Sequence, residues 1–131
     1  EVVIMTHEQL KEKVEREHTK SYLKAVELLP FVIQRFEEEL VSFNKNRSVD
    51  KPIVYFGSKD FQTNDYQTVV ELTKMLEEYI TNQGWLLSIK YPESYYMDVT
   101  TAFRMYTDTR KHRFFVWLQD TFNSSFSWDS Y

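Results

Sequence analysis

The hydrophobic and polar pattern of the chain gives its first clear signal at residues 5–10. Thr6 and Gln9 have the spacing of a capping box, in which each side chain accepts a hydrogen bond from the other residue's backbone. Met5 and Leu10 flank this pair at the positions of a hydrophobic staple. We therefore predict that a helix begins at about His7.

The first part of this helix is almost entirely polar. Leu10 and Val14 are the only apolar residues between 8 and 20, and the charged residues there have helical spacings that form weak ion pairs. A helix with so few apolar positions buries little area by itself. We expect it to project from the body or to pair with another copy, so a homodimer through the N-terminal helices is a hypothesis.

Apolar residues become dense after Tyr22, and Pro30 interrupts them. Proline lacks a backbone N–H and disfavours helical geometry at the preceding residue, so either the helix stops at Leu29 and a second begins at Pro30, or one long helix kinks there. We predict two helices, because proline is favoured in a first helical turn. The second helix ends near Asn44, and residues 45–50 form a polar loop. One face of this helix is apolar, at Val32, Phe36, Leu40 and Phe43.

The middle of the chain predicts a strand, a helix and another strand. Ile53–Phe56 is a short apolar run between Pro52 and Gly57, which is typical of a buried strand. A helix with one apolar face follows the capping residues 63–65 and ends at Gly84. Residues 85–91 alternate as a strand does, and we expect the three elements to form a right-handed βαβ unit.

The last third of the chain predicts two more strands. Residues 95–106 fit a helical face and a strand face equally well, and the β-branched residues at 99–101 favour the strand. The polar residues 107–110 would then close a hairpin to a strand at 113–120. The predicted fold class is α+β: two N-terminal helices followed by a β-α-β-β-β mixed sheet, with helices packed on one face.

The 131 residues are enough for one domain. Within it we distinguish a helical part (1–50), an α/β part (51–122) and a polar tail with large aromatic residues (123–131). The chain has no Cys, which excludes a disulfide framework, a thiol nucleophile and a Cys-ligated zinc site. The longest apolar runs, 28–33 and 114–118, are far shorter than a membrane span, and no leader opens the chain. We expect a cytoplasmic protein.

Catalytic signatures are missing from the sequence. No glycine-rich phosphate loop, GxSxG or HExxH motif occurs, and the three His residues are far apart in the chain. We therefore predict no catalytic residues, no metal site and no cofactor, and we expect a protein that is not an enzyme.

A basic segment interleaved with aromatic residues is the most distinctive local feature. Basic groups neutralise phosphates and aromatic faces stack on unpaired bases, so the hairpin from Arg104 to Trp117 is a candidate nucleic-acid-binding element. A structural alternative is that the charges only keep the end of the hairpin soluble. A further functional alternative is a metal-independent nuclease or toxin that uses His112 with these basic residues. The basic residues are Arg104, Arg110, Lys111, His112 and Arg113.

The tail supplies the preferred function, binding to another protein. Large aromatic residues are the usual anchors of protein interfaces, although the tail could also fold back onto the sheet. The chain is poor in Gly and rich in Lys, Asn, Tyr and Phe, as AT-rich genomes encode. We therefore predict a phage or mobile-element accessory factor, an inhibitor or adaptor that engages a host protein. The predicted anchors are Phe122, Phe126, Trp128 and Tyr131.

Overall fold

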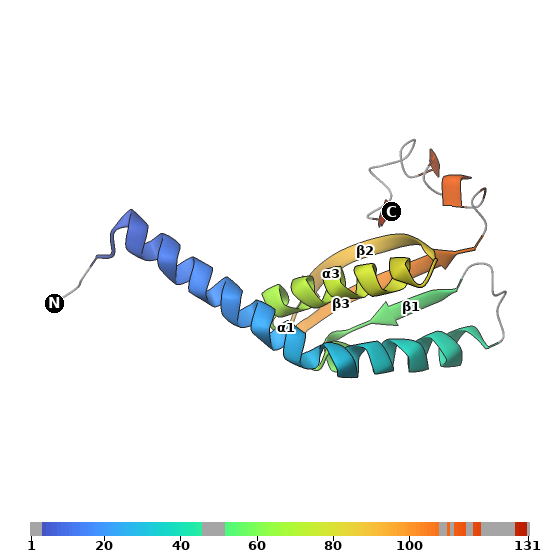
Figure 1. The fold of residues 1–131 in the computed structure, drawn as a ribbon, viewed down its shortest axis with the longest axis horizontal. Helices are drawn as coiled ribbons and strands as arrows, with labels where there is room; N and C mark the ends of the chain where they lie inside the picture. The colour runs from blue at the N-terminus through green and yellow to red at the C-terminus, as the bar shows by residue number, and fades with distance from the viewer. Residues whose placement is uncertain are drawn as a thin grey trace.

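The predicted α+β class is confirmed by the computed structural model, which describes residues 4–45, 52–107, 110, 112–114, 117, 118 and 128–130 (Figure 1). The elements run in the order α1 (His7–Asn44), β1 (Ile53–Phe56), α2 (Ser58–Phe61), α3 (Tyr66–Asn82), β2 (Leu86–Tyr95), β3 (Asp98–Tyr106) and β4 (Trp128–Ser130). The second half of α1 and the whole of α3 lie on the same side of the sheet (Figure 1).

The predicted start of α1 is confirmed. The Thr6 backbone N–H donates to Oε1 of Gln9 at 3.0 Å, and the Gln9 backbone N–H donates to Oγ1 of Thr6 at 3.2 Å. Both bonds satisfy N–H groups that the first turn of a helix leaves without a partner.

The prediction of two N-terminal helices is wrong, because α1 continues through Pro30. The helix changes direction about halfway along (Figure 1), as expected where proline removes one backbone hydrogen bond. Leu28 and Val32 are buried on either side of Pro30. Packing on both sides outweighs the cost of the missing bond, so the chain bends rather than stops.

The prediction of a mixed sheet is also wrong. The strand order is β1-β3-β2-β4 and every neighbouring pair is antiparallel. Strands β1 and β2 do run in the same direction, but β3 lies between them, with Phe103 opposite both Val54 and Ile89. The two-residue turn makes β3 the neighbour of β2, and β1 pairs with the other edge of β3, so β3 lies between them.

The predicted strand at 95–106 is confirmed for β3, but the predicted hairpin after it is wrong. The observed hairpin joins β2 to β3, where Tyr95 pairs with Asp98. Of the predicted strand at 113–120, the described residues 113, 114, 117 and 118 are helical, as are 110 and 112. The rings of Phe114 and Trp117 stack with their centroids 5.9 Å apart. Residues three apart face each other on a helix but point to opposite sides of a strand, so this contact fits the helix and not the predicted strand.

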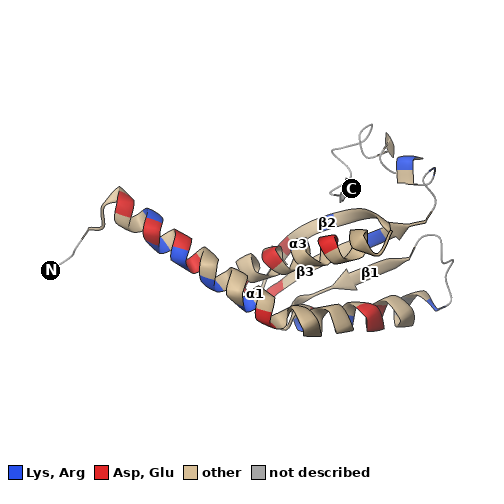
Figure 2. Ribbon diagram, in the orientation of Figure 1, with Lys and Arg blue, Asp and Glu red and all other residues tan. Residues whose placement is uncertain are grey.

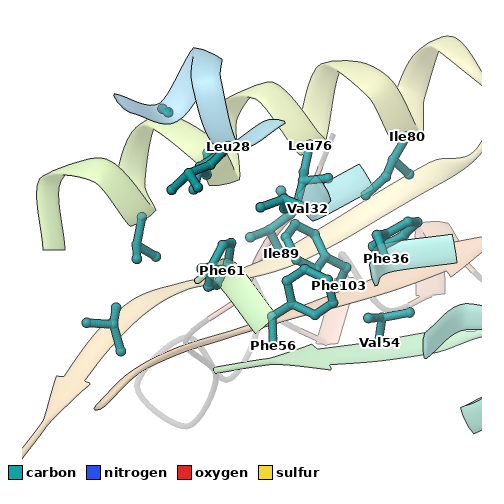
Figure 3. Packing of buried hydrophobic residues seen from close by; sticks show 14 of the residues in the cluster. Leu28, Val32, Phe36, Val54, Phe56, Phe61, Leu76, Ile80, Ile89 and Phe103 are labelled. Atoms are coloured by element: carbon teal, nitrogen blue, oxygen red, sulfur yellow. The ribbon is translucent and has the colours of Figure 1, made fainter. Parts of the chain in front are cut away.

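The core lies between the sheet and its helices, and Phe103 is at its centre (Figure 3). Phe36 of α1 meets Phe103 edge to face at 5.8 Å, and Phe56 of β1 does so at 6.2 Å. Phe56 in turn contacts Phe61 of α2 at 5.1 Å. Edge-to-face pairs add to the burial of the rings themselves, so these four side chains tie the helices to the sheet.

A side chain protects the outer edge of β1. Nδ2 of Asn44 donates to the Ile53 carbonyl, and the Ile53 N–H donates to Oδ1 of Asn44, both at 3.0 Å. One amide therefore takes the place of a neighbouring strand at this residue, as edge strands require. The same two bonds connect the end of α1 to the start of β1.

The central position of Phe103 leads to a test of the core. We expect Phe103→Ala to lower the free energy of unfolding by about 3–5 kcal/mol, because it removes a ring and leaves a cavity. Tyr55→Ala, on the adjacent strand but exposed, is the control and should cost less than about 1 kcal/mol. Urea denaturation followed by circular dichroism measures both, and equal losses would contradict this description of the core.

Candidate interaction surfaces

Arg104 lies on the face of the sheet opposite α1 and α3, and its side chain is partly buried. It hydrogen-bonds to the hydroxyl of Tyr106, which also bonds to Ser88. Burial raises the pKa of Tyr106, and the nearby Arg104 charge opposes that shift. Tyr106 is therefore packed and not available to stack on a base.

The structure brings His112 to this cluster but leaves the two arginines beside it in solvent. The His112 ring lies 5.3 Å from that of Tyr106, and its Nε2 is 3.4 Å from the Leu87 carbonyl. Arg110 and Arg113 are exposed. The predicted basic β-hairpin is thus replaced by a helical segment that packs through His112, and Lys111 lies outside the described residues.

The aromatic tail is described only at its backbone in β4. Trp128 pairs with Lys90 and Ser130 with Ser88, so residues 128–130 add a strand to the free edge of β2. The side chain of Trp128, and Phe122, Phe126 and Tyr131 altogether, lie outside the described residues. Their role as partner-binding anchors stays a prediction.

The turn between β2 and β3, which we call the tyrosine tip (Tyr96 and Met97), exposes two large side chains. Tyr96 is 87% exposed and Met97 is 79% exposed. Tyr96 has a φ of 55°, in the left-handed region that L-residues other than Gly and Asn rarely enter. Our sequence prediction missed this turn, because it contains no Gly or Asn and lies inside a run that alternates like a strand.

Contacts on both sides hold the base of this hairpin. The Ser58 N–H donates to Oδ1 of Asp98 at 2.9 Å, and the Val99 N–H donates to Oγ of Ser58 at 2.8 Å. Hydrogen bonds to the Asp98 carboxylate lower its pKa, that from the Ser58 N–H most of all and then those from the Ser58 side chain and the Val99 backbone. On β2, the Tyr66 hydroxyl donates to the Pro92 carbonyl at 3.3 Å. The tip therefore extends from a fixed base.

A second exposed surface is the first part of α1, residues 7–20, which we call the arm. Every residue of the arm is exposed, as we predicted for a projecting helix, and the arm stands away from the sheet (Figure 1). Acidic and basic residues alternate along it (Figure 2). Leu10 and Val14 are 50% and 53% exposed.

The arm meets the body at Asp65, the N-cap of α3. This carboxylate accepts from the Thr68 N–H at 3.0 Å, from the Thr68 hydroxyl and from the Ser21 hydroxyl of α1 at 3.2 Å. The bonds lower the pKa of Asp65, and the Thr68 hydroxyl has the largest effect. The same residue thus starts α3 and holds the base of the arm.

Comparison with known protein families, curated proteins and solved structures finds no match to this chain. In the part of the chain that the structure describes, no three His, Asp or Glu side chains gather as a metal site requires. None of the described helices is long and apolar enough to cross a membrane.

The capping role of Asp65 predicts a pH-dependent loss of stability. Asp65→Ala should lower the free energy of unfolding by about 1–2 kcal/mol at pH 7, the cost of a lost N-cap. Because the folded-state pKa of Asp65 is lowered, its contribution is present above the ordinary value near 4 and is lost as pH falls through the folded value.

The variant and the native protein should therefore converge in stability below about pH 4. Thermal unfolding between pH 2.5 and 7 measures this convergence. Asn64→Ala, an exposed neighbour outside the network, is the matched control and should change stability little at any pH. A constant difference between Asp65→Ala and the native protein across this range would contradict the assigned role.

Proposed function

We propose that this chain is a non-enzymatic binding protein that recognises another protein through the tyrosine tip. The observation that carries the proposal is the combination of strain and exposure at Tyr96. A left-handed conformation costs a residue such as Tyr roughly 1–2 kcal/mol, and here no burial of the ring offsets that cost. Gly or Asn would form the same turn with less strain, and we assign the 87% exposed ring a role in contact with a partner.

The chemistry of the tip indicates the kind of partner surface. Tyr supplies a rigid apolar ring with a hydroxyl, and Met supplies a flexible apolar chain that adapts to irregular pockets. A convex tip with these two side chains fits a shallow apolar pocket that has a hydrogen-bond acceptor at its rim. The residue usage that is typical of AT-rich genomes supports a phage or mobile-element origin, and the partner we propose for such a factor is a host protein.

Tyr96→Gly separates the use of the side chain from the stability of the fold. We expect this variant to be as stable as the native protein or more stable by up to about 1 kcal/mol, because Gly tolerates the left-handed conformation. It should nevertheless lose the partner that the native chain captures from a low-GC bacterial lysate. Tyr55→Ala removes an exposed Tyr from another place on the sheet and should retain it. Capture of the same protein by Tyr96→Gly would contradict the proposal.

One observation favours single-strand nucleic-acid binding as a second candidate. Phe114 and Trp117 are 60% and 56% exposed and stack on each other, on the same segment as the exposed Arg110 and Arg113. Proteins that bind single-stranded nucleic acid stack its bases on aromatic rings and neutralise its phosphates with nearby arginines. His112 packs against Tyr106 and the Leu87 carbonyl, which favours a packing role over a catalytic one.

This second candidate predicts salt-dependent binding that the two arginines control. Arg110→Ala with Arg113→Ala should weaken binding of single-stranded DNA or RNA and reduce the slope of log affinity against log salt by about 1.4. Fluorescence anisotropy at two salt concentrations measures both effects. Lys24→Ala, an exposed cation on α1, is the control. Equal affinities and slopes for the native protein and the arginine variant would contradict nucleic-acid binding by this segment.

A further inference from the structure

The charged residues of the arm are arranged symmetrically about Val14, with opposite signs on its two sides. An acidic residue at a given number of positions before Val14 is matched by a basic residue the same number after it, and the reverse also holds. The matched pairs are Lys13 with Glu15, Glu12 with Arg16, Lys11 with Glu17, and Glu8 with Lys20. Every Lys, Arg, Asp and Glu between residues 7 and 20 belongs to one of these pairs.

This symmetry distinguishes the two ways in which a pair of arms can lie side by side. In an antiparallel pair centred on Val14, each residue is level along the helix axis with its matched residue in the other copy, so every charge is level with one of opposite sign. In a parallel pair in register, identical residues are level, so every charge is level with one of the same sign. Like charges side by side are destabilising, so the charge pattern selects the antiparallel pair.

The arm also offers an apolar seam for this contact. Leu10 precedes the buried Leu28 by five full turns of the helix, and Val14 precedes the buried Ala25 by about three turns. Both therefore continue the stripe that α1 buries in the body, but in the arm nothing covers them within the described residues. In the antiparallel pair Val14 meets its own copy and Leu10 meets His18.

The residues beside the seam are complementary as well. Lys11 and Glu15 lie one turn apart on one side of the seam, and Lys13 and Glu17 lie one turn apart on the other. The antiparallel pair places Lys11 next to Glu15 of the second copy, and Lys13 next to its Glu17. Within the described residues, the arm contains one ion pair, between Lys20 and Glu17 at 3.1 Å, so Lys11, Lys13 and Glu15 are not engaged in one.

We propose that two copies of this chain pair through their arms, antiparallel and centred on Val14. The second copy fits because one sequence supplies both halves of the charge pattern. An arm of 14 residues is about 21 Å long, so the contact is at the small end of specific interfaces. The proposal does not rest on the tyrosine tip, and its failure would leave that surface unaffected.

The mass of the protein in solution is the first test. Sedimentation equilibrium at low salt should show a dimer that dissociates on dilution, and Val14→Asp should weaken dimerisation at least about tenfold, because it places two carboxylates at the centre of the seam. Thr19→Asp adds the same group on the opposite side of the helix and is the matched control. A native chain that stays monomeric up to about 1 mM would overturn the proposal, and so would a Val14→Asp variant that dimerises normally.

Exchanging the charges tests complementarity directly. Lys11→Glu with Lys13→Glu should weaken self-association, because each new Glu then faces Glu15 or Glu17 of the other copy. Glu15→Lys with Glu17→Lys should do the same with positive charges. An equimolar mixture of the two variants should restore the dimer, because every flanking contact is then between opposite charges. A mixture that stays monomeric while the native chain dimerises would overturn the arrangement.

Disulfide trapping tests the orientation and register of the pair. Because the chain has no native Cys, only the introduced cysteines can form a disulfide. Val14→Cys should form a disulfide-linked dimer on mild oxidation. Leu10→Cys alone should not, because its two sulfurs would lie about 12 Å apart along the pair. Leu10→Cys mixed with His18→Cys should give the mixed dimer. Efficient linkage of Leu10→Cys to itself would indicate a parallel pair and overturn the proposed orientation.

Discussion

Burial of the apolar stripe on the second half of α1 is the contact on which the rest of the fold depends. Val32 and Phe36 of this stripe are buried, and Phe36 meets Phe103 on the central strand edge to face. Ala25 and Leu28 are buried before Pro30, so α1 is held against the body on both sides of the proline and bends there instead of stopping. The position of the body half of α1 in turn determines where the arm leaves the protein.

The two halves of α1 show how environment decides what one helix does. After residue 25 the stripe has the sheet and α3 to cover it, whereas before residue 21 it has neither. The charges on the arm keep it in solution, and its capping box starts the helix far from any tertiary contact. A helix that extends this far beyond its own core provides surface that folding does not use.

The tyrosine tip likewise combines a fixed base with an exposed end. Asp98 accepts from the Ser58 N–H, and Tyr66 donates to the Pro92 carbonyl, so both strands of the hairpin are held by neighbouring elements. Strain at Tyr96 persists because these surrounding contacts determine the backbone there. The arm and the tip differ in chemistry, one charged and self-complementary and the other apolar, which suits them to different partners.

Local signals determined a large part of this structure. The capping box placed the start of α1, Pro52 and Gly57 bounded β1, and the alternation at 99–105 indicated β3 correctly. The exposure of the arm followed from its lack of apolar residues, and its matched charges can be read from the sequence without any structure. These features depend on residues within a few turns or a few strand positions of one another.

Tertiary structure decided what such local patterns leave open. Leu28 and Val32 keep α1 continuous across Pro30 because both find partners in the body. The central place of β3 depends on Phe103 lying opposite Val54 and Ile89, which are distant in the chain. The continuous run of apolar residues around Phe114 and Trp117 suits a buried strand, yet the described residues there are helical and His112 packs against Tyr106. The sequence by itself determined where several elements begin and which of their faces are apolar. Contacts between distant residues decided how the strands and helices pair. Several arrangements of these elements bury a similar apolar area, and only the complete core distinguishes them.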